Sequence, residues 1–526
     1  MEKQVEGSER MNGAEIIIKT AKAAGVEVCF VNAGTTEIPL LAAFDSKPGI
    51  RAILGLFEGV CTGAADGYGR MLDKPAMTLL HHGPGFANGI ANLHNARRAQ
   101  TPLLNIIGDH ATWHRHADAP LTMDIEALAG SVSGWLKNCN SVGMLSRDFA
   151  DAVAAAMHGR IASLIVPHDL QLYELKNAKI ISTEFSFEPV DTNTVEKAAR
   201  FLKNGKKIAF ILGGRALRKR GLEAAGRIKA AAGCDLFVGS FPGYMERGAG
   251  LPDVVRVPYF PEGAIQMLSK YEGIILAGAK EPVTFFGYDG VPSFVLAQNQ
   301  QKVSIGMGKE DVVEAMEYLA DLLKTPEYSK IMNKTSTKPN RPAIPDGVLT
   351  PEKACIILAA LQPEDAIIVD EGITSSLTYY PLTAGSPHHS MMTIAGGAIG
   401  YGMPCAVGAA IACPDRPVIN LQADGSALYT LQALWTEARE SLNVTTLMCS
   451  NRSYNILKME LVRAGIKSSG QSAQSLIDLD NPDINWVKIA GGFGVPAVSV
   501  DTAEGLAREM GKALAEPGPH LVEMIL

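Results

Sequence analysis

Short apolar runs alternate with longer amphipathic segments along most of the chain. The runs are typical of buried strands, whereas the longer segments carry apolar residues at helical spacing. In the first third, this alternation predicts helices at 12–24, 37–45 and 58–71 and strands at 26–31, 50–54, 76–81 and 103–107. Strands that alternate with helices are typical of a parallel sheet with helices on both faces, so the pattern predicts a doubly wound α/β fold.

Polar stretches divide this pattern into three parts. Residues 183–193 form a short linker, and residues 328–350 form a longer one that contains Lys, Thr, Asn and Pro. A chain of 526 residues is also too long for a single core. We therefore expect three doubly wound parallel-sheet domains, at 11–182, 192–325 and 345–526.

Composition narrows the class of protein. Hydrophobic residues make up 47% of the chain and charged residues 20%, as in ordinary globular proteins. The net charge of −7 argues against nucleic-acid binding, and no apolar stretch is long enough to span a membrane. The N-terminus, MEKQVEGSER, lacks an apolar signal core, and the eight scattered cysteines include no CxxC pair. We expect a cytoplasmic protein with reduced thiols.

The segment 417–453 carries the strongest chemical signal. Its pattern predicts a strand at 417–423, the turn Asp424-Gly425-Ser426, a helix over 427–440 capped by Ser426, and a strand at 444–449. A crossover of this kind brings both strand ends to the same edge of a parallel sheet. Asp424 and Asn451, which follow the two strands, should therefore be neighbours.

A carboxylate and an amide oxygen beside a helix N-terminus suit Mg²⁺, which prefers oxygen ligands and is often shared with phosphates. The free amides of the helix would favour those phosphates further. Alternatively, Asp424 merely begins a tight turn and Asn451 merely ends a strand. The spacing of the two residues across one crossover favours the metal site.

This segment resembles the cofactor motif of the thiamine-diphosphate-dependent enzymes, the superfamily of acetolactate synthase, pyruvate decarboxylase and benzoylformate decarboxylase. The motif is Gly-Asp-Gly followed by Asn-Asn, and this chain has Ala423 and Ser450 where the first Gly and first Asn usually stand. The resemblance implies thiamine diphosphate and Mg²⁺, with Asp424, Asn451 and the carbonyl of Ser453 as metal ligands. It covers nearly the whole chain and implies pyrimidine-binding, middle and diphosphate-binding domains.

Glu58 follows an apolar strand, at the point where a helix rich in small residues begins. Burial there would favour the neutral acid and let it exchange a proton near neutral pH. The run FEGVCTGAADGYGR resembles the helix that carries the family's cofactor-activating glutamate, which assigns that role to Glu58. Alone, such a residue would be read as a helix-start glutamate that interacts with the macrodipole. The small-residue face suits close packing, which we expect across a subunit interface.

Histidines gather near the ends of two predicted strands, and histidine suits proton transfer near working pH. His81 and His82 precede a predicted glycine-rich turn. The resemblance to benzoylformate decarboxylase aligns His81 with that enzyme's catalytic histidine and Thr35 with its active-site serine. The alternative for His81 is a structural histidine at a strand end.

His110 and His114 lie in the loop after the strand 103–107. Loops at strand carboxyl ends often line sites in such sheets. The resemblance relates these two residues loosely to loop histidines of pyruvate decarboxylase, and we count them as candidate catalytic residues. A solvated polar loop is the alternative.

The resemblance also assigns the cofactor contacts in the C-terminal third. Thr374 and Ser375 follow a predicted strand and can donate hydroxyls to a diphosphate. In the loop 396–402, Ile399 takes the place of the bulky residue that bends the cofactor. The expected cofactor-binding residues are Glu58, Thr374, Ser375, Gly397, Ile399, Gly425, Ser426, Tyr454, Asn455 and Ile456. The last three open a segment that usually covers the substrate.

The middle part carries no catalytic motif. Gly213-Gly214 alone is a weak nucleotide-binding signal, so we expect a structural domain that binds no FAD. We also expect Arg215, Arg218, Lys219 and Arg220 to lie on a solvated helix face.

Together these features predict a thiamine-diphosphate- and Mg²⁺-dependent 2-oxo acid decarboxylase of the benzoylformate decarboxylase type, with carboligation as a further activity. One alternative is an acetolactate-synthase-type carboligase without an evident flavin. Another is a catalytically silent, cofactor-binding partner subunit. The expected substrate is a small 2-oxo acid or aldehyde, and the expected assembly is a homodimer or homotetramer with sites at the subunit interface.

Overall fold

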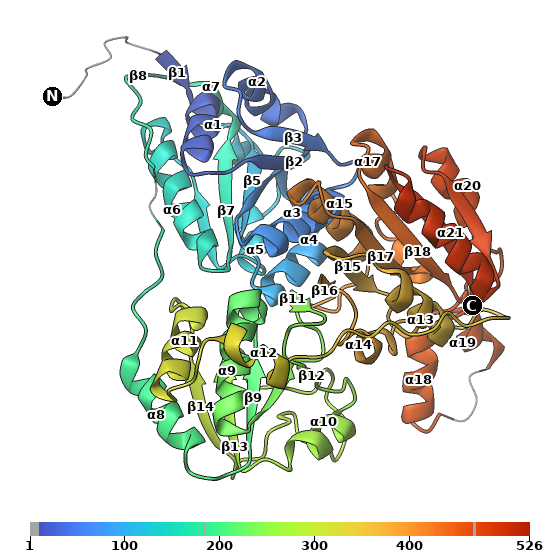
Figure 1. The fold of residues 1–526 in the computed structure, drawn as a ribbon. Coiled ribbons are helices and arrows are strands. Elements are labelled where there is room, and N and C mark those ends of the chain that lie inside the picture. The colour runs from blue at the N-terminus through green and yellow to red at the C-terminus, as the bar shows by residue number, and fades with distance from the viewer. Residues whose placement is uncertain (1–9, 183–184, 467–469) are drawn as a thin grey trace.

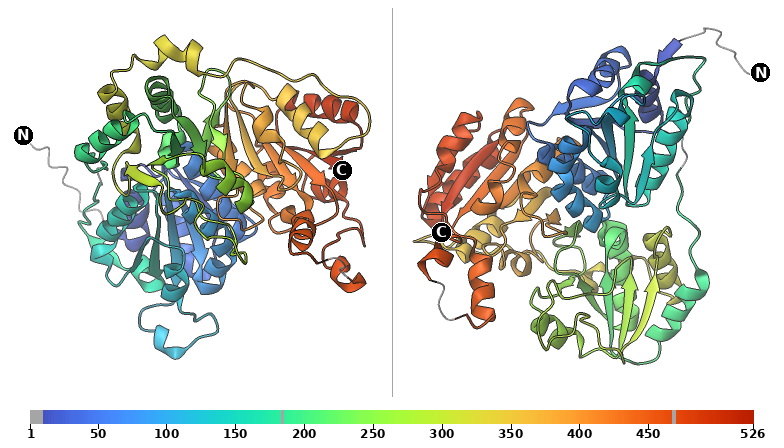
Figure 2. Two further views of the ribbon diagram at one scale, coloured as in Figure 1. Left: turned by 90° about the horizontal axis from the view of Figure 1, so that it is seen from below. Right: turned by 180° about the vertical axis from the view of Figure 1, so that it is seen from behind.

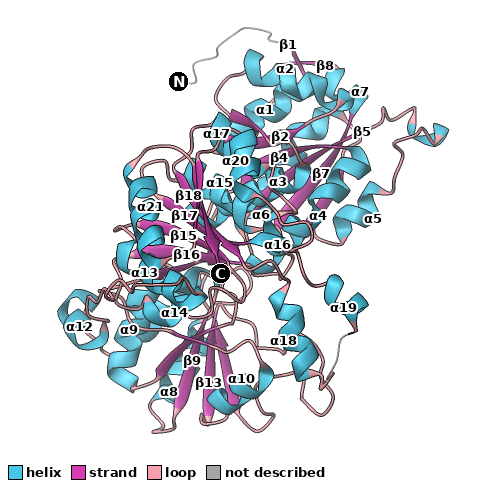
Figure 3. Cartoon of the chain, turned by 90° about the vertical axis from the view of Figure 1, so that its right-hand side faces the viewer, coloured by secondary structure: helices cyan, strands magenta, loops and turns pink. Residues whose placement is uncertain are grey.

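The computed structural model describes residues 10–182, 185–466 and 470–526. It contains three sheets built mainly of parallel strands and flanked by helices (Figure 1). Figure 2 shows the three parts from two further sides, and Figure 3 shows the strands at the centre of each part. The doubly wound α/β class predicted from the alternating pattern is confirmed. Among the helices described, none has the length and apolar character needed to cross a membrane.

The N-terminal sheet has six strands, and all its pairings are parallel. Its order is β3 (Arg51–Leu54), β2 (Val28–Asn32), β4 (Ala76–His81), β5 (Leu103–Asp109), β7 (Ile161–Pro167) and β6 (Trp135–Asn138). The helices of this part are α1 (Gly13–Ala23), α2 (Ile38–Ser46), α3 (Glu58–Leu72), α4 (His82–Ala99), α5 (Ile125–Gly130), α6 (Leu145–Met157) and α7 (His168–Leu172). An antiparallel pair, β1 (Arg10–Asn12) with β8 (Glu174–Lys176), lies beside them.

The central sheet has five strands. Its order is β12 (Val255–Arg256), β10 (Asp235–Val238), β9 (Ile208–Leu212), β13 (Gly273–Ala277) and β14 (Gln301–Ile305). Its helices are α8 (Thr192–Leu202), α9 (Lys219–Ala232), α10 (Pro261–Leu268) and α11 (Val312–Leu322).

Part of the expected second linker is a helix, α12 (Tyr328–Thr335). Tyr328 anchors it, because a Cβ on Gly226 would lie only 2.4 Å from the Tyr328 ring and the Tyr328 hydroxyl donates to the carbonyl of Gly250 at 3.0 Å. The polar composition of the segment therefore did not reveal this packed helix.

The C-terminal sheet has seven strands. Its order is β11 (Met245–Arg247), β16 (His389–Thr393), β15 (Ala366–Glu371), β17 (Val418–Ala423), β18 (Val444–Ser450), β20 (His520–Ile525) and β19 (Ala497–Val500). Its helices are α13 (Pro351–Leu361), α14 (Tyr379–Leu382), α15 (Gly402–Ala412), α16 (Asp424–Ala427), α17 (Ala433–Arg439), α18 (Asn455–Arg463), α19 (Gln471–Ser475), α20 (Trp486–Gly492) and α21 (Ala503–Ala515).

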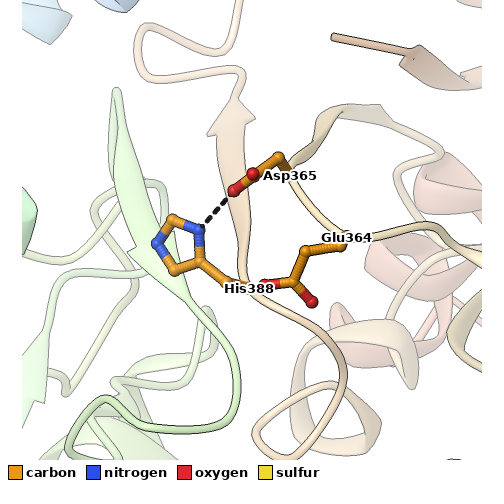
Figure 4. Close-up of side chains that lie close together, drawn as sticks. All are labelled: Glu364, Asp365 and His388. Carbon is orange, nitrogen blue, oxygen red and sulfur yellow. Dashed lines mark hydrogen bonds and ion pairs between the residues drawn. The ribbon is translucent and has the colours of Figure 1, made fainter.

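The edge strand β11 comes from the segment expected to form the middle domain, yet it pairs antiparallel with β16. Beside it, the His388 ring lies between two carboxylates, with Nδ1 2.9 Å from Asp365 Oδ1 and Nε2 3.0 Å from Glu246 Oε2. Figure 4 shows His388 with Asp365 and Glu364. The bond to Glu246, followed by that to Asp365, raises the pKa of His388. This junction ties the central segment to the C-terminal sheet.

Helices α3 and α15 approach each other backbone to backbone and join the N-terminal and C-terminal parts. A Cβ on Gly67 would lie 2.1 Å from the carbonyl oxygen of Cys405, and one on Gly408 would lie 1.9 Å from that of Ala64. The small-residue face of α3, expected across a subunit interface, therefore packs within the chain.

Arg70 of α3 lies where the three parts meet. It pairs with Asp66 through two hydrogen bonds, of 2.8 and 2.5 Å, and both residues are buried. Its Nη1 also donates to the carbonyls of Gly243 and Thr393 and to the Tyr401 hydroxyl, at 2.8–3.0 Å. One guanidinium thus bonds to the central and C-terminal parts.

Two other arginines correct a sequence-based expectation. Arg215 pairs with Asp73 at 2.7 Å, and Arg218 donates to the backbone carbonyls of Arg70 and Met71. They bridge the central part to the end of α3 and do not lie on a solvated face, although Arg220 does pair with Glu317 on the surface.

The helix expected over 427–440 is interrupted. The single turn α16 begins at Asp424 with Ala423 as its uncapped N-cap, so Ser426 lies inside the turn and caps nothing. The next helix begins at Ala433, because residues 428–432 bend around the loop at Gly400: Thr430 Oγ1 donates to its carbonyl at 3.0 Å. A tertiary contact overrides the helical periodicity here.

The glycine-rich turn expected after His81 is instead the start of α4 at His82. The glycines let this helix lie against α3, since a Cβ on Gly89 would lie 2.7 Å from Thr62 Cγ2. Glycines that suggest a turn in sequence therefore serve close helix packing.

Glu437 of α17 is fully buried, and neither of its carboxylate oxygens has a hydrogen-bond partner among the described residues. Burial raises its pKa well above the ordinary value of a glutamate. The folded protein therefore keeps a proton that the unfolded chain releases. The resulting contribution to stability is present below the ordinary glutamate pKa and is lost as pH rises toward the raised value.

Replacing Glu437 by glutamine should remove this pH dependence. Near pH 8.5 the thermal unfolding midpoint of Glu437→Gln should exceed that of the wild type, whereas near pH 4.5 the two should be close, since each unit of raised pKa is worth about 1.4 kcal/mol. Differential scanning calorimetry measures both midpoints. Glu314→Gln changes an exposed glutamate of α11 and is the matched control. A wild-type midpoint for Glu437→Gln at high pH would contradict the assignment.

Candidate active site

Asp424 and Asn451 lie side by side at the carboxyl edge of the C-terminal sheet, as the crossover requires. Strands β17 and β18 pair in parallel with Ala423 opposite Cys449. Asp424 Oδ2 accepts a hydrogen bond of 2.7 Å from the backbone N–H of Arg452, and Asn451 Oδ1 accepts one of 3.0 Å from Ser453 N–H. The expected metal ligands thus come from two adjacent strand ends, which the bond from Arg452 to Asp424 joins.

The Asp424 carboxylate is 2% exposed, and burial raises its pKa. Within the described ranges, no lysine, arginine or histidine side chain pairs with it. A buried carboxylate without a cationic partner is costly, and a bound cation would offset that cost. Its neighbours offer amide and carbonyl oxygens, so the donor set fits Mg²⁺.

The residues expected to hold the diphosphate lie near these two strand ends. Gly425 lies under Tyr454, since a Cβ there would be 2.5 Å from the Tyr454 ring. Asn455, at the start of α18, reaches Thr374 Oγ1 at 3.4 Å, and the adjacent Ser375 is buried. Ser426 is also buried within α16, and Ile456 lies in the first turn of α18.

A buried glutamate orders the glycine loop that precedes α15. Glu371 is fully buried at the end of β15 and accepts hydrogen bonds from the backbone N–H groups of Gly400, Tyr401 and Gly402, at 2.8, 3.1 and 2.6 Å. Gln422 donates a fourth at 2.9 Å. These bonds fix the loop that carries Ile399 and Gly397.

Helix α4 holds the same loop from the other side. Asn95 donates to the Ala398 carbonyl at 2.7 Å, and His94 Nε2 lies 3.1 Å from the carbonyl oxygen of Gly396. Asn92 donates to both Gly59 and Gly400, at 2.9 and 3.1 Å. The start of α3 and the glycine loop are therefore neighbours within one chain.

Glu58 is the first residue of α3 and is only partly buried in the single chain. Its Oε2 accepts a hydrogen bond of 3.0 Å from Asn88. A Cβ on Gly85 would lie 3.1 Å from Glu58 Oε1 and 3.4 Å from the Cβ of His81, so only a glycine separates the two side chains. The structure thus brings together two of the predicted catalytic residues.

His81, at the end of β4, is held by a residue that the sequence did not single out. Its Nδ1 lies 2.8 Å from Oε2 of the fully buried Glu37, and Thr36 Oγ1 donates to the other carboxylate oxygen at 2.5 Å. Glu37 also accepts a hydrogen bond from Gly34 N–H at 2.8 Å. The predicted residue Thr35 is exposed and makes no side-chain hydrogen bond in the part of the chain described.

The remaining histidines form a row of rings beside His81. Ring centroids are 4.6 Å apart for His81 and His82, 4.4 Å for His82 and His110, and 5.7 Å for His110 and His114. Desolvation, and then repulsion by His82, lower the pKa of His110. His110 and His114 are thus linked to His81 through the buried His82.

Within the single chain, the catalytic candidates of the N-terminal sheet are not bonded to the candidate metal ligands of the C-terminal sheet. Over residues 10–182, 185–466 and 470–526, no hydrogen bond or ion pair joins the side chains of Glu58 or His81 to Asp424 or Asn451. Both sheets nevertheless contact the glycine loop. The N-terminal part does so through Asn92 of α4, and the C-terminal sheet does so through Glu371.

Fold and site together are those of a multidomain α/β enzyme with a candidate cation site lined by oxygens, a glycine-rich loop and a histidine–carboxylate pair. The chain matches the family model described as thiamine pyrophosphate enzyme, N-terminal TPP binding domain, over residues 11–129. It matches the corresponding C-terminal TPP binding domain over residues 373–524. The chain belongs to the thiamine pyrophosphate enzymes, which confirms the resemblance.

Two curated relatives cover almost all of the chain. A putative acetolactate synthase large subunit of Mycobacterium tuberculosis is 44% identical and spans 98% of this chain and 99% of its own. The benzoylformate decarboxylase of Pseudomonas aeruginosa is 26% identical, with 95% and 96% covered. A solved Rhodococcus jostii thiamine diphosphate-dependent 4-hydroxybenzoylformate decarboxylase superposes with a TM-score of 0.84 at 22% identity, over 98% of this chain and 99% of that one. This last likeness confirms the fold.

Removing the Asp424 carboxylate tests the cation site. Asp424→Ala should lose magnesium-dependent binding of thiamine diphosphate, because the variant lacks the anionic ligand of the expected metal set. Titration calorimetry with and without Mg²⁺ measures this. Asp480→Ala, which changes an exposed aspartate of the same region, is the control. Wild-type affinity in Asp424→Ala would mean that the metal is held elsewhere.

Proposed function

We propose that this chain is a Mg²⁺- and thiamine-diphosphate-dependent decarboxylase of 2-oxo acids. The observation that carries the proposal is the Glu37–His81 pair, which lies beside Glu58 across Gly85. When CO₂ leaves a 2-oxo acid, the carbon that held it must gain a proton before an aldehyde departs. An imidazole held by a buried carboxylate is well suited to deliver that proton.

In this proposal, Asp424, Asn451 and the carbonyl of Ser453 would hold Mg²⁺, and Thr374 and Ser375 would face the diphosphate. Bound thiamine diphosphate supplies the electron sink for the charge left when CO₂ departs. Glu58 would exchange a proton with the pyrimidine ring, while Ile399 would support the bend between the two rings. The Glu371 hydrogen bonds to the backbone of Gly400 and Tyr401, next to Ile399, support this role.

A second candidate is a carboligase, favoured by the 44% identity to a putative acetolactate synthase. Decarboxylation and ligation share the loss of CO₂ and differ in the step after it. A decarboxylase adds a proton to the carbon, whereas a carboligase adds a second carbonyl compound. His81 therefore distinguishes the two.

We also propose that the working enzyme is a homodimer or homotetramer whose sites lie between subunits. Three large apolar side chains near Glu58 and His81 are 42–56% exposed in the single chain: Ile38, Leu56 and Met123. Such a surface favours contact with another chain. Glu58 itself is only partly buried, and a second subunit would complete its burial.

Mixing two inactive variants tests the shared site. If Glu58 of one subunit serves the metal edge of another, Glu58→Gln and Asp424→Ala chains should restore activity when they are refolded or expressed together. Each mixed dimer would then contain one site with both residues intact. Turnover and mixed-dimer mass are measured together, and a mixture of Glu58→Gln with itself is the control. Mixed dimers without activity would place both residues in one chain's site.

Replacing His81 separates the two reactions. His81→Ala should lower aldehyde formation about 10²–10⁴-fold, the usual contribution of a general acid, while ligation falls less. Both products are measured between about pH 5.5 and 8, where an ordinary histidine titrates. His116→Ala, which changes an exposed histidine, is the control. If neither rate changes, His81 is a structural histidine and the proton comes from another group.

A further inference from the structure

Aromatic side chains gather at the carboxyl edge of the central sheet, to which the sequence assigned no chemistry. They come from the segments after β10, β12 and β13. Phe285 is central: its ring centroid lies 5.8 Å from Phe241, 5.3 Å from Tyr259 and 5.0 Å from Phe286. Phe260 extends the group, 4.9 Å from Tyr259.

The central ring, Phe285, and its neighbour Phe286 are not buried by the group. Phe285 is 43% exposed although it packs against three rings, and Phe286, which packs against Phe285, is 53% exposed. Exposed aromatic surface that is gathered at a strand-end edge favours binding of an apolar group.

Phe285 lies against the glycine loop of the candidate active site. Gly397 has φ +75°, and a Cβ there would be 2.5 Å from Phe285 Cζ. A side chain on Gly397 would therefore clash with the Phe285 ring in its present position. Gly397 is only two residues from Ile399, so the ring borders the segment expected to hold the pyrimidine.

The other side of the aromatic group is joined to α18. Tyr288 donates to Glu460 at 3.2 Å, and Arg463 lies over the Tyr288 ring at 4.0 Å. Arg463 also pairs with Glu262 through hydrogen bonds of 2.8 and 2.5 Å. These contacts keep α18 against the loops that carry Phe285 and Phe286.

We propose that Phe285, assisted by Phe286, forms the wall that receives the substituent of the 2-oxo acid. The inference rests on the proposed function, because the glycine loop and α18 flank the reacting groups there. A wall of flat rings gains more from an aryl or other bulky apolar substituent than from a methyl group. The site therefore selects arylglyoxylates over pyruvate.

The test compares kcat/KM of the holoenzyme for benzoylformate and for pyruvate. The wild type should favour benzoylformate by about 10-fold or more, the range that apolar pocket contacts give. Phe285→Ala should reduce this preference about 10-fold, mainly through KM for benzoylformate, and Phe286→Ala should reduce it less. Phe294→Ala removes another ring from the same loop. Phe294 is 57% exposed, and its ring does not contact the described aromatic group. This control should leave the preference unchanged.

Binding of inert analogues supplies a second readout. Mandelate and lactate are the 2-hydroxy counterparts of benzoylformate and pyruvate and lack the reacting carbonyl. Saturation-transfer NMR of the holoenzyme should show mandelate bound more tightly than lactate, and Phe285→Ala should remove most of that difference. Phe285→Leu, which keeps an apolar side chain, should restore part of it.

The outcomes separate this inference from the proposed function. Equal preference for the two acids in the wild type, or an unchanged preference in Phe285→Ala, would overturn the role of Phe285. If no 2-oxo acid is decarboxylated at all, the proposed function fails. In that case the mandelate comparison still decides whether Phe285 forms an apolar binding wall.

Discussion

The close contact between α3 and α15 is the constraint on which the rest of the structure depends. Gly67 and Gly408 let the two backbones meet, and Arg70 then bonds to Asp66, the central part and the C-terminal part at once. A buried arginine is tolerated only when its donors are satisfied, and removal of one partner of such a pair typically costs about 3–5 kcal/mol. The contact therefore fixes how the parts meet, since small displacements would leave charged donors unpaired.

This helix contact also sets the positions of the site segments. Glu58 is the first residue of α3, and the glycine loop with Ile399 runs directly into α15. Gly63 lies against Pro404 and Gly408 lies against Ala64, so the middle of α3 packs against the first half of α15. Asn92 bonds to the backbone at both beginnings. The packing of small residues thus places the start of α3 beside the glycine loop of the same chain.

The sequence predicted the features that depend on local order. The predicted bounds of β4 are those that the structure has. The adjacency of Asp424 and Asn451 follows from the single crossover between β17 and β18. It did not identify Glu37 or Glu371, because their partners His81 and Gly400 lie 44 and 29 residues away and belong to other elements. The break before α17 was missed for the same reason, since Gly400 causes it. Phe285 carries no motif at all, and only its contact with Gly397 relates it to the site.

Three buried carboxylates show how the surrounding donors determine the role of each. Glu371 has four hydrogen-bond donors, three of them backbone amides, and these bonds oppose the rise in its pKa that burial causes. Asp424 has two backbone donors and no cationic side chain within the described residues, so part of its charge remains available to a metal ion. Glu437 has no donor among them, and burial makes the neutral acid its stable form. Burial alone therefore does not identify a functional carboxylate. A buried carboxylate at a sheet edge is a better candidate when its charge has no cationic partner. Because Asp424 meets this condition, it is the residue to which a cation would bind.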